Sequence, residues 1–334
     1  MNAKVRKSAN LLLRLAIMVL TMVFLYRQLF AKTGAEQWID MIGPLLLPGR
    51  ARNLFLFALA LLPLNMMLES LKWQLIIQPL ERVPFVNALA AVLAGISVSL
   101  FLPNRIGDYL GRIFVLRKAN PAEAVLLTVI GSFSQLIVIG IAGAIALLIL
   151  LPRMQFLQFL PEPFGFWSVL MMSVLAIGAG ILLYFNLPLL RRVFSGRKGW
   201  VFRIEQLLGV YELLSNQRLF LLLLISAARY LVFSTQFYLL ILAFGQPVPY
   251  LTALTLISMI YLLMTIIPTI AISELGIRGS VTVAVFALYF GADAAQTGMV
   301  VLAASSMLWL INLAFPALLG AFAVNRLRFI RTDD

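Results

Sequence analysis

The sequence predicts an all-α polytopic membrane protein, with a single integral membrane domain over residues 1–334 and a membrane core from residue 8 to residue 324. The first observation is composition: 62% of the residues are hydrophobic, the mean hydropathy is +1.01 and only 12% are charged. A soluble domain carries about 25% charged residues. The second observation is the length of the apolar runs, which reach about 20 residues and so fit membrane-spanning helices better than the short alternating strands of a barrel.

Six apolar runs are long enough to span a bilayer as helices. They cover residues 10–26, 54–71, 122–151, 166–185, 219–244 and 294–324. The first run follows Lys4, Arg6 and Lys7, as in a signal peptide, but no small-residue cleavage site comes after it. We therefore expect the first run to remain as a span.

Two further apolar segments, residues 86–117 and 251–291, are interrupted. The first stops at Pro103 and the second at Pro268, and each then continues through charged residues into a short apolar piece. We predict two broken re-entrant helical hairpins, which a bilayer tolerates only where protein or a water-filled cavity surrounds the break. The alternative, ordinary spans whose loops lie outside the membrane, remains open.

Basic residues predict the orientation. They gather at the N-terminus, in residues 191–218 and in residues 326–331, which places both termini in the cytoplasm. One basic segment, residues 27–52, falls outside in this scheme. The two hairpins then enter from opposite faces and form an inverted repeat, as in transporters whose half-helices meet near the bilayer midplane.

The absence of cysteine and histidine excludes disulfides, thiolate nucleophiles, Cys/His metal sites and imidazole acid–base chemistry. We expect no metal and no cofactor. The net charge of +13 is interpreted as loops that touch anionic lipid, not as a nucleic-acid surface.

The two interruptions contain similar charged pairs. Asp108 precedes Arg112 by four residues and Glu274 precedes Arg278 by four, so each acid and base share one helix face. Arginine binds phosphate oxygens in a bidentate manner, the acids would orient the arginines, and glycine permits close approach of a ligand. The predicted substrate-binding residues are Arg105, Gly107, Asp108, Arg112, Glu274, Gly276 and Arg278. The alternative is that the pairs are closed salt bridges that hold the hairpins together.

Other polar residues in the spans have simpler interpretations. Glu69 and Lys72 end the second span, where such residues anchor a helix at the interface. Arg229 is expected to extend its side chain toward the cytoplasmic surface. Gln135 and Asn312 are expected to form hydrogen bonds between helices.

The stretch "LPNRIGDYLGRIFVL" resembles a signature of the lysylphosphatidylglycerol synthase transmembrane-region family, and "IPTIAISELGIRGSVTVAVF" resembles its second signature. Residues that match these signatures are Arg105, Gly107, Asp108, Arg112, Pro268, Gly276 and Arg278. Thr269 and Ile270 replace the usual Gly-Gly pair. The resemblance implies the flippase-like membrane half of multiple-peptide-resistance-factor proteins, here as a stand-alone member without a lysyl-transferase domain.

The resemblance and the charged pairs together lead us to expect a flippase for an anionic or lipid-linked phosphate headgroup in a bacterial inner membrane. The expected partner is a membrane phospholipid or lipid-linked substrate. Two alternatives stay open: a non-catalytic membrane subunit of a lipid or glycan biosynthetic enzyme, and a lipid-linked glycosyltransferase with Asp108 or Glu274 as base.

Overall fold

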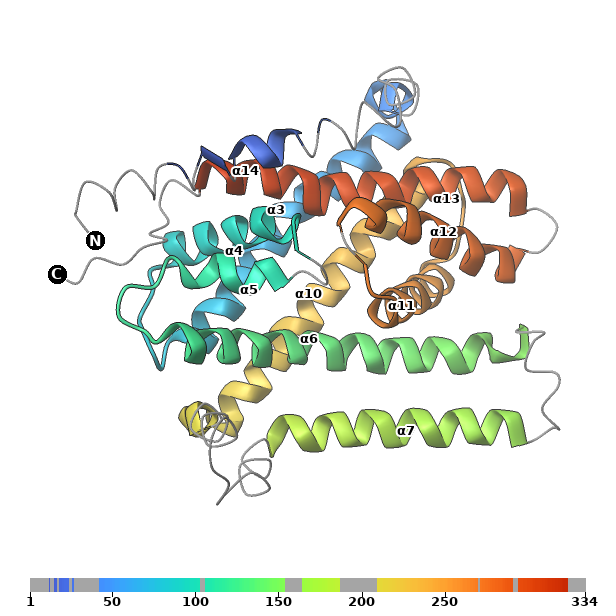
Figure 1. Ribbon diagram of the computed structural model, residues 1–334. Helices are drawn as coiled ribbons and strands as arrows, with labels where there is room; N and C mark the ends of the chain where they lie inside the picture. Colours follow the sequence, from blue (N-terminus) through green and yellow to red (C-terminus); the bar gives the residue numbers. More distant parts are fainter. Residues whose placement is uncertain are drawn as a thin grey trace.

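The computed structural model describes residues 12, 15–16, 18–23, 26, 42–102, 106–153, 164–186, 209–269, 271–290 and 294–323. All regular structure in these residues is helical (Figure 1). The helices discussed below are α3 (Arg50–Ile77), α4 (Phe85–Ser99), α5 (Ile106–Ile113), α6 (Pro121–Leu150), α7 (Phe164–Phe185), η5 (Gly209–Leu213), α10 (Asn216–Ala243), α11 (Tyr250–Ile266), α12 (Ala271–Phe290), α13 (Ala294–Trp309), the π-helix η7 (Leu310–Ala314) and α14 (Phe315–Ala323).

Five helices in the described ranges are long and apolar enough to cross a membrane. They are α3, α6, α7, α10 and the continuous stretch α13–η7–α14 from Thr297. These helices confirm five of the six predicted spans. The first predicted span, residues 10–26, lies largely outside the described residues.

Side-chain caps begin two of the spans. Asn120 accepts a hydrogen bond from the Ala122 amide (3.0 Å), and Pro121 occupies the first helical position of α6. Ser215 accepts a hydrogen bond from the Arg218 amide (3.3 Å) at the start of α10. Each cap satisfies a backbone donor that has no partner within the helix, so these helices begin where the sequence changes from loop to apolar run.

The two interrupted segments form helix pairs with breaks between them. The 15 residues of α4 extend about 22 Å, short of the roughly 30 Å of a bilayer's hydrocarbon core. The chain turns at residues 100–102, and α5, which has 8 residues, begins at Ile106. The second pair consists of α11, with 17 residues, and α12, with 20. Whether these pairs are re-entrant in the membrane remains a prediction.

One boundary differs from the expectation. The sequence suggested a polar connection from Pro268 to about residue 279, followed by a short apolar helix. Instead α12 begins at Ala271 and continues to Phe290. The reason is that Glu274 and Arg278 pair across one helical turn, so the charged stretch is compatible with helix.

Glycines allow α5 to fold back directly onto α4. A Cβ atom on Gly111 would lie 2.5 Å from the Cα atom of Gly95, and a Cβ atom on Gly107 would lie 2.5 Å from the carbonyl carbon of Val98. A Cβ atom on Gly95 would lie 2.5 Å from Oδ1 of Asp108. The missing side chains therefore bring the charged face of α5 close to α4.

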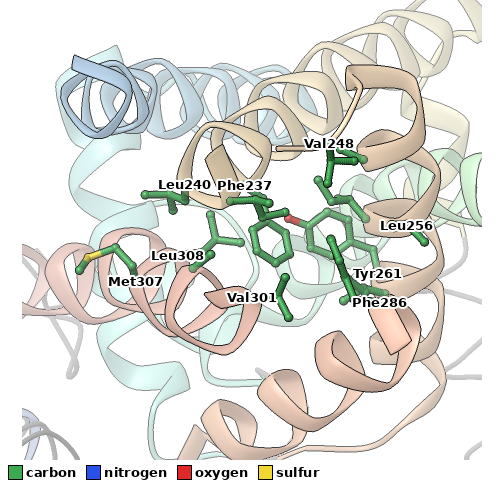
Figure 2. Packing of buried hydrophobic residues seen from close by; sticks show 14 of the residues in the cluster. Phe237, Leu240, Val248, Leu256, Tyr261, Phe286, Val301, Met307 and Leu308 are labelled. Carbon is green, nitrogen blue, oxygen red and sulfur yellow. The ribbon is translucent and has the colours of Figure 1, made fainter. Parts of the chain in front are cut away.

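The two helix pairs lie beside opposite ends of α6 (Figure 1). One hydrophobic cluster joins α4 to the first half of α6, through residues such as Val92 and Leu127. A second cluster joins α10, α11, α12 and α13, and Figure 2 shows Phe237, Tyr261 and Phe286 meeting in it. Each pair thus has its own apolar core, and the broken ends of both pairs point toward the region between the cores.

We expect Gly111→Ala to destabilise the protein by about 1–3 kcal/mol, because the added methyl group would force α5 away from α4. The matched control is Gly140→Ala in α6, where a Cβ atom would meet nothing within 4 Å. Thermal unfolding of both variants in detergent measures the difference. Equal melting temperatures for the two would contradict the close packing described above.

Candidate functional site

A cavity of about 550 Å³ lies between the two helix pairs. Its wall includes Ser99 at the end of α4 and residues Ile266 to Thr269 at the break after α11. The charged side chains in the wall are Glu69, Asp108, Arg112, Arg229, Glu274 and Arg278. The structure therefore brings the two predicted acid–arginine pairs, which are distant in sequence, to one cavity.

Two other predicted site residues, Gly107 and Gly276, do not line this cavity. Gly107 packs against the backbone of Val98 and Ser99. Gly276 is exposed, because it lies two residues from both Glu274 and Arg278 and so faces the opposite side of α12. Arg105 lies outside the described residues. In the structure Gly107 allows close packing of α5 on α4, and a contribution of either glycine to ligand binding stays a prediction.

Arg112 contacts two carboxylates, through its Nε atom and one terminal nitrogen. Its Nε atom lies 3.0 Å from Oδ1 of Asp108, and one terminal nitrogen lies 2.5 Å from Oδ2 of the same carboxylate. That terminal nitrogen also lies 2.8 Å from Oε1 of Glu69. With only 3% of its surface exposed, Arg112 is a buried charge whose compensation is already complete.

Glu69 is the centre of the charged network. Its carboxylate contacts Lys72 (2.9 Å), Arg112 (2.8 Å) and Arg229 (2.8 Å), from α3, α5 and α10. Glu69 and Lys72 are 5% and 3% exposed, so their interpretation as interface anchors is wrong. Arg229 also does not extend to the surface, because its Nε atom donates to Oδ1 of Asn65 at 2.9 Å. Burying these charges is affordable only because they compensate one another.

In the second acid–arginine pair, Glu274 and Arg278, the arginine contacts fewer described carboxylates than Arg112 does. One terminal nitrogen of Arg278 lies 2.8 Å from Oε1 of Glu274, which is 3% exposed. The Nε atom of Arg278 is buried and has no hydrogen-bond partner among the described residues. The two sequence motifs therefore differ in the structure, since Arg278 keeps a donor that Arg112 has used.

A chain of side-chain amides fixes the helices around the cavity. Asn65 donates to Asn312 (2.8 Å), Asn312 donates to Gln236 (2.7 Å), and Gln236 donates to the carbonyl oxygen of Ala58 (2.8 Å). Asn312 lies in η7, a π-helical turn of the kind that often occurs at functional sites. Gln135 donates to the carbonyl oxygen of Ser226 at 3.2 Å. These bonds confirm that Asn312 and Gln135 connect helices.

The network carries excess positive charge within the part of the chain that the structure describes. Its cations are Lys72, Arg112, Arg229 and Arg278, and its carboxylates are Glu69, Asp108 and Glu274. One positive charge is therefore not balanced. In a poorly solvated cavity this excess favours an anionic ligand, because Coulomb attraction is stronger at low dielectric constant.

These features define a multi-pass membrane protein with a cationic cavity between two broken helix pairs. The chain belongs to the family of the lysylphosphatidylglycerol synthase TM region, whose family model matches residues 11–320. This match confirms the resemblance seen in the sequence and connects the chain with membrane lipids. No curated protein and no solved structure matches the chain.

We expect Glu69→Gln to destabilise the protein by about 3–5 kcal/mol, because two buried cations and the partly buried Arg229 lose their shared counter-ion. The double variant Glu69→Gln/Lys72→Met removes one cation as well and should recover part of the loss. Glu123→Gln, at a partly buried position in the first turn of α6, is the control. Thermal unfolding in detergent measures all three, and a Glu69→Gln protein as stable as the Glu123→Gln control would refute the role of Glu69.

Proposed function

We propose that this protein moves an anionic phospholipid, or a lipid-linked phosphate headgroup, between the leaflets of a bacterial inner membrane. The observation that carries the proposal is the cationic cavity at which the two acid–arginine pairs meet, beside the breaks of both helix pairs. The acyl chains would stay in the bilayer while the headgroup passes through this cavity. Family membership supports the connection with lipids.

The chemistry of the cavity fits a phosphodiester. Guanidinium groups bind phosphate oxygens with strong, directed hydrogen bonds, and three arginines line the wall. Counted over the described residues, the network has one excess positive charge, which equals in magnitude the single negative charge of a phosphodiester. A bound headgroup would thus neutralise the site, whereas an uncharged lipid would leave the excess positive charge in place.

The arrangement of the helix pairs favours translocation over binding alone. The pairs lie beside opposite ends of α6, and the ends of α4 and α11 both reach the cavity (Figure 1). Broken helices whose ends meet near the midplane are typical of transporters that expose one site to either face in turn. We propose that the two pairs are re-entrant from opposite faces and that both termini are cytoplasmic, as the distribution of basic residues supports.

We expect Arg278→Ala to reduce lipid translocation at least about tenfold, since a lost charge-assisted contact of about 1.4 kcal/mol or more has that effect. The protein is reconstituted in liposomes with headgroup-labelled phosphatidylglycerol, and the exposure of inner-leaflet label to an impermeant quencher is followed over time. Arg82→Ala, at an exposed position between α3 and α4, is the matched control and should translocate normally.

Failure of the wild-type protein to accelerate exposure of any anionic lipid would contradict the proposal. A biosynthetic enzyme that then co-purifies in stoichiometric amount would instead support a membrane-subunit function. Unchanged translocation by Arg278→Ala, with an active wild type, would remove Arg278 from the site while leaving the transport function intact.

A further inference from the structure

Two buried N–H donors in the cavity wall lack partners. Among the described residues, Nε1 of Trp309 and Nε of Arg278 are buried and form no hydrogen bond, and both residues line the cavity. The Trp309 side chain is one of the largest in the interior and is 2% exposed. Glu69, whose Oε2 atom also lacks a hydrogen bond, is compensated by two cations within 2.9 Å. Unpaired buried donors are rare because each costs about 1–3 kcal/mol.

The two donors lie on neighbouring elements. Leu275, three residues before Arg278 and so on the same side of α12, packs in one hydrophobic cluster with Trp309. One turn beyond Arg278, the Thr282 hydroxyl donates to the Ser305 hydroxyl (3.4 Å), which lies one turn before Trp309. These contacts on either side place Arg278 next to the end of α13, and hence on the same side of the cavity as Trp309.

In each of the other two arginines that line the wall among the described residues, Nε and one terminal nitrogen are engaged. Arg112 contacts Asp108 and Glu69. Arg229 contacts Glu69, Asn65 and, at 3.5 Å, the Oε1 atom of Gln135. Among the described residues that line the cavity, the buried donors without a partner therefore lie on the α12–α13 side.

We infer that the Trp309 indole N–H and the Arg278 Nε–H together bind an oxygen of the headgroup phosphodiester, an assignment that rests on the proposed function. Both groups only donate, so they select an acceptor such as a phosphate oxygen, and Arg278 adds the positive charge. Arg112 is then a framework residue. This assignment revises the symmetric expectation that Arg112 and Arg278 hold the phosphate in equal parts.

The test compares Trp309→Phe with Trp73→Phe in the full chain in detergent. Both substitutions remove one indole N–H and the same volume from a buried tryptophan. The Trp73 donor, however, already bonds to Oγ1 of Thr128 at 3.2 Å, and Trp73 does not line the cavity. Phosphatidylglycerol, diacylglycerol with the same acyl chains, and inorganic phosphate are titrated, and the rise in melting temperature reports binding.

We expect phosphatidylglycerol to stabilise the wild type and Trp73→Phe over the same concentration range, and Trp309→Phe to require at least about tenfold more lipid. Arg278→Lys, which keeps the charge but not the Nε–H donor, should show the same loss. Diacylglycerol should stabilise none of them. Without lipid, Trp309→Phe should melt at a higher temperature than Trp73→Phe, because it breaks no existing hydrogen bond.

A Trp309→Phe protein that binds phosphatidylglycerol as the wild type does would overturn this inference, and would mean that solvent satisfies the indole. If inorganic phosphate raises the melting temperature as much as phosphatidylglycerol does, and Trp309→Phe loses this effect, the site binds free phosphate and the headgroup assignment is overturned. If phosphatidylglycerol does not raise the melting temperature of the wild type at any concentration, this result would contradict the proposed function itself. That last result is distinct from a response that Trp309→Phe retains.

Discussion

The compensation of three cations by one carboxylate, Glu69, is the interaction on which the rest of the site depends. A single charge near the centre of a membrane helix costs about 2.5–3.5 kcal/mol even on insertion scales. By contacting Lys72, Arg112 and Arg229, Glu69 connects α3, α5 and α10 at one point. The short helix α5 has few apolar contacts of its own, and this charged connection, with its glycine packing against α4, fixes it at the cavity.

The cost of burying charged groups without partners also explains how the interior is arranged. One apolar cluster packs the first helix pair and another packs the second, while the charged and amide groups lie between them. Polar groups in an apolar medium must find partners, so they gather in one network instead of dispersing along the spans. The amide chain through Asn65, Asn312 and Gln236 continues this network into the long helix α13–η7–α14. The cavity lies in this layer, and its wall contains charged and amide side chains together with apolar ones.

The sequence was sufficient to predict the helical membrane class, five spans and the meeting of the two acid–arginine pairs. The sequence was insufficient to predict that Glu69, Lys72 and Arg229 form a network inside the protein. A position near the end of an apolar run does not reveal whether protein or lipid surrounds a residue. The signal available was an acid and a base three residues apart in one span, with an isolated arginine in another. Intramembrane charges of opposite sign usually pair, but the choice of partners depends on helix packing that no single stretch of sequence contains.

The same limitation explains why two similar motifs differ in the structure. Asp108–Arg112 and Glu274–Arg278 have the same spacing, and in each the acid compensates the arginine one turn away. The difference comes from a third helix: Glu69 of α3 reaches Arg112, and no described carboxylate besides Glu274 forms an ion pair with Arg278. The pair Asp108–Arg112, whose arginine has a second counter-ion, is suited to stabilise the helix packing. The pair Glu274–Arg278, whose arginine has an unused donor, is suited to bind a ligand that comes and goes. Two similar motifs at one cavity therefore need not take equal parts in the binding proposed for the headgroup.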